Sequence, residues 1–141
     1  MNLSPAQNYS HLLEISYKNL LDLVTPEGIN ASGKDEIYGC IFGRDSAITI
    51  LKILKTVSNS QKNSKLLLDK NNILIDNTLL LEICRRSLLI LTQLQGLKSN
   101  LESGEQPGKF IHEYRTQKFD HLVNSDDNWY VYPDGIMRNY D

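Results

Sequence analysis

The sequence is poor in cysteine and carries no strong excess of charge. Cys40 and Cys84 are its two cysteines, which are too few for a disulfide framework and lack the CxxC spacing of a zinc site or redox motif. Both are therefore expected to be reduced core residues. The formal net charge is -2, so the basic surface that attracts nucleic acid or an anionic membrane is missing. We expect neither nucleic acid nor a membrane as a partner.

Long apolar runs are also missing. A membrane-spanning helix needs about 18 or more apolar residues in succession, and no such stretch occurs. Residues 1–5 show no charged region followed by an apolar run, so no signal peptide is predicted and the cytoplasm is the expected compartment. The 141 residues are 40% hydrophobic and 23% charged, which fits one globular domain with a single core.

Helical periodicity marks two segments in the first half of the chain. Residues 5–24 carry apolar side chains at steps of three and four, and Pro26 ends the pattern. A second helix is predicted over about 45–57, with Asp45 or Ser46 as its N-cap because a short side-chain oxygen accepts an unpaired backbone N–H. The buried stripe predicted for this helix consists of Ala47, Ile50, Leu51, Leu54 and Val57.

A third helix is predicted over about 77–96. Asp76 or Asn77 is suited to cap its start, and Gly96 is suited to end it in a left-handed conformation. The segment is apolar around most of its circumference, so we expect it to be buried on two sides. Residues 58–75, which precede it, are rich in Ser, Asn and Lys and are predicted to form a polar surface connection.

The pattern changes after residue 99 to loops and short extended stretches. Residues 109–115 alternate weakly and fit a short strand, and residues 129–132 are aromatic and extended. Pro133-Asp134-Gly135 is typical of a turn. Three long helices joined by long loops nevertheless dominate, so the predicted fold class is all-α.

Gly43-Arg44-Asp45-Ser46 lies at the predicted junction of a loop and the second helix. Backbone N–H groups and the positive end of a helix point outward at such a junction. Arg44 and Asp45 together offer donors and acceptors that suit the neighbouring hydroxyls of a sugar ring. The alternative is that Asp45 is an N-cap beside an exposed arginine.

The segment from Pro107 to Arg115 combines His, Glu and Arg in a long loop. If it is extended, Lys109, Ile111, Glu113 and Arg115 share one side, because side chains alternate along extended backbone. Glu113 beside Arg115 would stay ionised, which suits a substrate ligand or a general base better than a general acid. The alternative is a surface ribbon whose Glu–Arg pair has little energetic weight.

Other chemistries find little support. His112-Glu113 lacks the second histidine of an HExxH motif, because position 116 is threonine. Gly33-Lys34 lacks the rest of a phosphate-binding loop. We therefore expect neither a metal nor a cofactor. Trp129 and Tyr130 would be able to stack on sugar rings, although aromatic side chains also serve as ordinary core anchors.

Taken together, these motifs resemble a known group of enzymes. The chain resembles the (α/α)6-barrel glycosidases in three features. These are an Arg-Asp-Ser at the start of an early helix, a long apolar helix, and a Pro-Gly-Lys-x-x-His-Glu-x-Arg loop. Within that group the chain resembles glucoamylases of glycoside hydrolase family 15 and amylo-α-1,6-glucosidase (glycogen-debranching) domains. The similarity extends over roughly residues 29–141.

The resemblance implies an α-glucan or oligosaccharide substrate cleaved at α-glucosidic bonds. It implies that Arg44 and Asp45 bind the non-reducing glucose, that Glu113 and Arg115 lie at the same mouth, and that Trp129 and Tyr130 line the approach. It also implies that residues 1–141 are the N-terminal part of a barrel of six helical hairpins.

On this comparison the two catalytic carboxylates lie beyond Asp141, and Glu113 is at most a supporting carboxylate. Two alternatives remain open. One is a small helical carbohydrate-binding or interaction module without catalysis, and the other is a relative of trehalases, invertases or sugar phosphorylases.

Overall fold

The computed structural model describes residues 5–59, 67–68, 74–116 and 130–141. Within these ranges lie three α-helices: α1 (Pro5–Leu23), α2 (Gly43–Asn59) and α3 (Asn77–Gln93). The three predicted helices are confirmed, with end points that shift by one to three residues. None of the helices in the described part of the chain is long and apolar enough to cross a bilayer.

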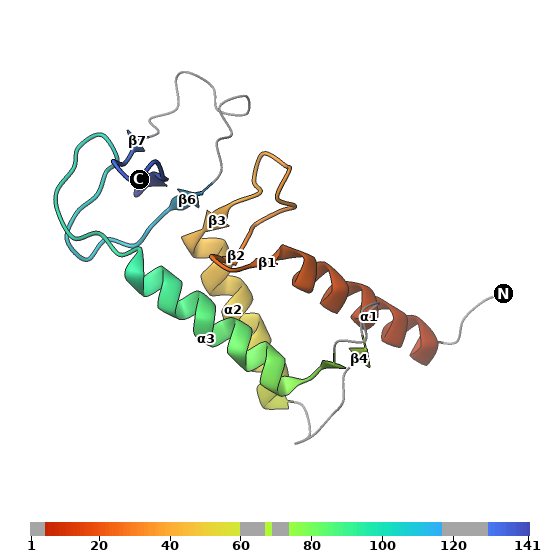
Figure 1. Ribbon diagram of the computed structural model, residues 1–141. Helices are drawn as coiled ribbons and strands as arrows, with labels where there is room; N and C mark the ends of the chain where they lie inside the picture. The colour runs from red at the N-terminus through yellow and green to blue at the C-terminus, as the bar shows by residue number, and fades with distance from the viewer. Residues whose placement is uncertain (1–4, 60–66, 69–73, 117–129) are drawn as a thin grey trace.

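Helices α2 and α3 form an antiparallel pair that holds most of the core (Figure 1). The face of α2 that packs inward carries Ser46, Ile50 and Ile53, with Val57 partly buried against the core. The predicted stripe is therefore confirmed at Ile50 and Val57 and wrong at Ala47, Leu51 and Leu54, which are exposed. Both stripes satisfy helical spacing and share Ile50 and Val57. The Ser46 hydroxyl donates to the carbonyl oxygen of Ile29 at 3.1 Å, and this buried contact turns the Ser46 side of the helix inward.

Helix α3 begins with the predicted cap, because Oδ1 of Asp76 accepts the N–H of Leu79 at 2.9 Å. Its end differs from the prediction. Leu94 is the C-cap residue, while the N–H of Gly96 donates to the carbonyl oxygen of Lys109 at 2.8 Å. A Cβ at position 96 would lie 2.3 Å from the carbonyl oxygen of Gln106, so this glycine permits a close approach of two loops.

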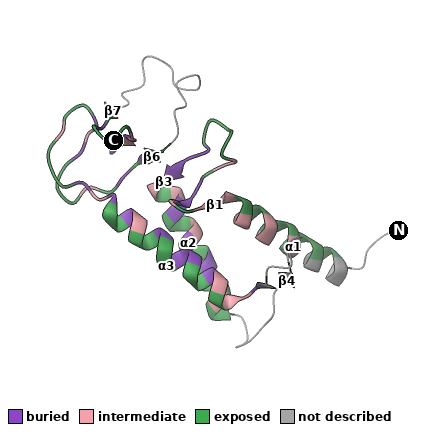
Figure 2. Ribbon diagram, in the orientation of Figure 1, coloured by how far each residue is buried: buried purple, intermediate pink, exposed green. Residues whose placement is uncertain are grey.

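The expectation that α3 is buried on two sides is also wrong. One face packs on α2 through Leu80, Ile83, Cys84 and Leu91. The opposite face exposes Leu81, Leu88 and Leu89, with Leu88 48% exposed, as the green outer side of α3 shows in Figure 2. Apolar composition all round a helix therefore does not establish a second packing partner within the described residues.

Short strands join the helices. The largest sheet is antiparallel, in the order β3-β6-β8-β7, and consists of β3 (Ile41–Phe42), β6 (Glu113–Arg115), β8 (Met137–Asn139) and β7 (Tyr130–Val131). Two further antiparallel pairs are β1 (Val24–Thr25) with β2 (Gly28–Ile29), and β4 (Leu67–Leu68) with β5 (Leu74–Ile75). Ile75 is fully buried, and residues 60–66 and 69–73 of the predicted polar connection lie outside the described residues.

The all-α class, and with it the partial (α/α)6 barrel, is therefore corrected to a mixed α/β arrangement. The strands in the described ranges are two or three residues long, too short to display an alternating pattern that identifies a strand. Their pairing joins distant segments, such as Phe42 with Glu113, and local propensity carries no information about such partners. The four-stranded sheet lies beside the end of the helical pair where α2 begins and α3 ends (Figure 1).

Candidate functional site

The sheet brings the two motifs together. Strand β3 runs directly into α2, and its Phe42 pairs with Glu113 of β6. The N–H of Gly43 then donates to the carbonyl oxygen of His112 at 3.0 Å. A Cβ at position 43 would lie 2.1 Å from the carbonyl oxygen of Ile111, so only glycine permits this approach. The start of α2 therefore lies against the loop that contains Glu113.

Arg44 and Asp45 are accessible at this junction. Nη2 of Arg44 lies 3.2 Å from Oδ2 of Asp45, and the two side chains are 74% and 44% exposed. Asp45 lies in the first turn of α2 rather than at the N-cap, where the positive helix end stabilises a carboxylate. An exposed ion pair of this kind contributes about 0–1 kcal/mol. Both groups are therefore free to exchange their mutual contact for contacts with a ligand.

Glu113 and Arg115 lie in a different environment, because they are 5% and 4% exposed. Nε of Arg115 donates to Oε1 of Glu113 at 2.7 Å, and Nη2 donates to the carbonyl oxygen of Ile37 at 2.6 Å. The two side chains share one side of β6, as alternation predicts. The pair is thus neither an exposed ribbon nor an open ligand, and it fastens the loop around Ile37 to the sheet.

The Cys40 thiol completes this buried cluster. Its Sγ donates to Oε1 of Glu113 at 3.1 Å. Burial and the hydrogen bond to the Glu113 carboxylate raise the pKa of the Cys40 thiol, so the sulfur stays protonated and acts as a donor. Cys40 and Cys84 are both buried, which confirms that they are core residues.

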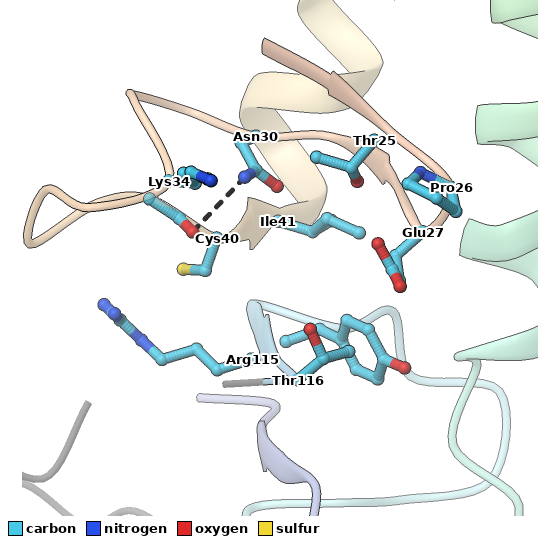
Figure 3. Close-up of a pocket in the computed structure, with 11 residues that line it drawn as sticks. Thr25, Pro26, Glu27, Asn30, Lys34, Cys40, Ile41, Arg115 and Thr116 are labelled. Atoms are coloured by element: carbon cyan, nitrogen blue, oxygen red, sulfur yellow. Dashed lines mark hydrogen bonds between the residues drawn. The ribbon is translucent and has the colours of Figure 1, made fainter. Parts of the chain in front are cut away.

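A cleft opens between β6 and the loop that leads from β1 to β3 (Figure 3). Its volume is about 320 Å³. Its lining combines charged, hydroxyl, amide and apolar side chains, and consists of Thr25, Pro26, Glu27, Asn30, Lys34, Gly39, Cys40, Ile41, Tyr114, Arg115 and Thr116. Of these residues only Arg115 was predicted from the sequence as a site residue, because residues 25–41 carry no recognisable functional motif.

Of the two aromatic candidates, Trp129 and Tyr130, the structure describes Tyr130. The Tyr130 ring makes an edge-to-face contact with Tyr132, with ring centroids 4.9 Å apart, and is half-buried. Trp129 lies outside the described residues. Tyr130 is not among the described residues that line the cleft, and the roles of Trp129 and Tyr130 toward a sugar stay predictions.

Tyr132, Glu105 and Ser103 form a second buried polar cluster, which was not predicted from the sequence. The Tyr132 hydroxyl donates to Oε2 of Glu105 at 2.6 Å and lies 2.8 Å from Oγ of Ser103. Burial tends to raise the pKa of Glu105, but hydrogen bonds from Tyr132 and from the backbone N–H groups of Leu97 and Lys98 outweigh it and lower that pKa. Burial and Glu105 together raise the pKa of Tyr132 to about 12. Glu105 and Ser103 lie in a stretch that reads as an ordinary polar loop, so no sequence signal marked them.

Within the described ranges, no group of three or more His, Cys, Asp or Glu side chains is arranged to hold a metal ion. Comparison of the chain with protein-family models, with curated proteins and with solved structures gave no match.

Proposed function

We propose that this chain recognises carbohydrate as the sugar-subsite part of a glycoside hydrolase that acts on α-glucosidic bonds of glucans or oligosaccharides. The observation that carries the proposal is the accessible Arg44–Asp45 pair at the start of α2. The guanidinium supplies several N–H donors and the carboxylate supplies acceptors only. A pair of adjacent sugar hydroxyls, each of which donates and accepts, satisfies both groups at once.

Glu113 and Arg115 act in this proposal as positioning residues. Their ion pair joins β6 to the loop around Ile37, and β6 in turn holds β3 and the start of α2. A site whose side chains are supported by buried contacts binds with less loss of conformational entropy. We assign neither a general acid nor a general base among the described residues.

A carbohydrate-binding or interaction module without catalysis is the second candidate. The burial of Glu113 favours it, because this carboxylate is covered by Arg115 and Cys40 and offers no access to a substrate. Glucose release from maltose by the isolated chain would exclude the module, whereas both candidates predict no release, because neither assigns a general acid or base to the described residues. The cytoplasm is the compartment that we propose with either candidate, because it keeps cysteines such as Cys40 and Cys84 reduced.

Calorimetric titration of the 141-residue chain with maltose tests the proposal. Asp45→Asn keeps the shape of the side chain and removes its charge, and a hydrogen bond to a charged group contributes about 1.5–3 kcal/mol. We expect the dissociation constant for maltose to rise by about tenfold or more. Asp22→Asn, an exposed substitution on α1, is the matched control. Equal affinities of all three proteins would contradict the proposal.

A further inference from the structure

The cleft of Figure 3 carries chemistry that the Arg44–Asp45 pair does not explain. Glu27 lies at one end of it and Lys34 at the other, while Arg115 and Thr116 lie on the opposite wall (Figure 3). Its volume of about 320 Å³ falls at the small end of the range of ligand sites. A ligand the size of one or two small rings fits this space better than a polymer segment.

The charges in the lining balance. Within the described part of the chain, no hydrogen bond or ion pair engages the Glu27 carboxylate or the Lys34 ammonium, whereas Arg115 is neutralised by Glu113. The cleft thus presents one acceptor group and one donor group of opposite charge, with no net charge. A neutral ligand with many hydroxyls matches this lining. An anionic ligand would be repelled by Glu27, and a cationic ligand would be repelled by Lys34.

The remaining lining supplies an apolar wall and further polar contacts. Tyr114 and Ile41 line the cleft beside the hydroxyl of Thr25, which donates to the carbonyl oxygen of Gly28 at 3.2 Å and keeps lone pairs to accept. Burial raises the pKa of Tyr114, and the Glu27 carboxylate raises it further, so the phenol stays a neutral donor. Flat aromatic rings pack well against the C–H face of a sugar ring while polar groups meet its edge.

The cleft is also held open by internal bonds. Nδ2 of Asn30 donates to the carbonyl oxygen of Gly39 at 3.3 Å, as the dashed line in Figure 3 shows. Arg115 binds the carbonyl oxygen of Ile37 from the other wall. The loop therefore has its shape before any ligand arrives, and less conformational entropy is lost on binding.

We propose that this cleft binds a single neutral sugar ring, with Glu27 accepting hydroxyl protons at one end and Lys34 donating at the other. The proposal rests on the proposed function for the class of ligand, and it adds a binding site. Ile41 in the cleft is three residues from Arg44, so their Cα atoms are at most about 11 Å apart. The cleft and the Arg44–Asp45 pair therefore lie close together.

Titration of the full chain with glucose, with maltose and with the zwitterion alanine tests this site. Glu27→Gln and Lys34→Met are each expected to raise the dissociation constant for glucose by about tenfold. The matched controls are two exposed residues outside the lining, Asp35 in the same loop and Lys55 in α2. Asp35→Asn and Lys55→Met are expected to leave the dissociation constant for glucose unchanged. Circular dichroism of each variant confirms that it is folded as the parent is.

The pattern of variants separates this proposal from the proposed function. If Asp45→Asn weakens maltose binding while Glu27→Gln and Lys34→Met do not, the proposal that the cleft binds sugar is overturned and the proposed function stands. If Glu27→Gln and Lys34→Met weaken sugar binding while Asp45→Asn does not, the cleft is supported as a sugar site and the role of the Arg44–Asp45 pair is contradicted. Binding of alanine in preference to glucose overturns the assignment of a neutral sugar. Absence of any sugar binding overturns both.

Discussion

Nη2 of Arg115 lies 2.6 Å from the carbonyl oxygen of Ile37, a residue 78 positions earlier in the sequence. The same guanidinium binds Glu113 through Nε, and Glu113 in turn accepts the Cys40 thiol. One buried ion pair therefore ties the cleft-forming loop to the sheet. The position of the candidate site depends on this contact.

Arg115→Met is expected to destabilise the chain strongly. It leaves the Glu113 carboxylate buried without its cation, and breaking a buried pair in this way costs about 3–5 kcal/mol. Urea unfolding followed by circular dichroism measures the loss. Arg44→Met, which removes an exposed partner, serves as the control and is expected to change the free energy of unfolding by less than about 1 kcal/mol.

The double variant Glu113→Gln/Arg115→Met sharpens this prediction. It removes both charges, so part of the stability lost in Arg115→Met should return, and the two single effects should not add. Two results would show that the Glu113–Arg115 pair does not fasten the loop around Ile37 to the sheet. One is strict additivity of the two single changes in the free energy of unfolding, and the other is a loss of stability for Arg115→Met as small as that for Arg44→Met.

Gly43→Ala is expected to destabilise the chain although alanine favours helices. The added Cβ would lie 2.1 Å from the carbonyl oxygen of Ile111, and forced overpacking costs about 1–3 kcal/mol. Maltose binding should weaken as well, because Arg44 follows directly. Gly33→Ala is the control, since its Cβ would meet the flexible side chain of Glu36 at an ordinary distance of 3.4 Å. Equal melting temperatures of Gly43→Ala and Gly33→Ala would argue against the close approach of α2 to β6.

The helices were predictable because their information is local. The apolar spacing of α1, α2 and α3 and the cap at Asp76 can all be read within about twenty residues of sequence. The face that α2 buries was not predictable, since stripes through Ser46 or Ala47 fit the same period. Distant contacts decide between them: Ser46 donates to Ile29, and Ile50 and Ile53 pack into the core that α2 shares with α3.

The site was predictable only in part, for the same reason. Arg44, Asp45, Glu113 and Arg115 stand out as residue types in a pattern, and the structure places their two segments side by side. The burial of Glu113 and Arg115 was not evident from the sequence, because it depends on the loop around Ile37 covering Arg115. Glu27, Lys34 and Glu105 belong to no motif, and only the folded chain gives them neighbours.

Glu105 should make the stability of the chain depend on pH in the acid range. Hydrogen bonds lower its pKa in the folded state below 4.5, so folding favours the carboxylate. This contribution is fully present above the unfolded pKa and is lost as the pH falls through the lower folded pKa. The stability gap between the parent chain and Glu105→Gln should therefore narrow on acidification, as measured by urea unfolding at a series of pH values. A gap that stays constant, or widens, would contradict the assignment.

Neither cysteine should react readily in the folded chain. Burial raises the pKa of both thiols, and the thiolate is the reactive form. Titration with a disulfide reagent at neutral pH should therefore detect little thiol in the native chain and both cysteines in urea. Glu113→Gln removes the acceptor carboxylate that raises the pKa of Cys40, so it should speed the reaction at Cys40 more than at Cys84. Rapid modification of Cys40 in the native parent would contradict the buried cluster.

Chemical-shift mapping with maltose tests the central claim most directly. In the nitrogen–proton spectrum of the full chain, the amides of Gly43, Arg44 and Asp45 are expected to shift with the sugar concentration and to saturate together. Asp45→Asn should raise the maltose concentration at which the shifts are half-saturated by about tenfold. Saturable shifts confined to segments away from the start of α2, or no saturable shift at all, would show that carbohydrate recognition by Arg44 and Asp45 is wrong.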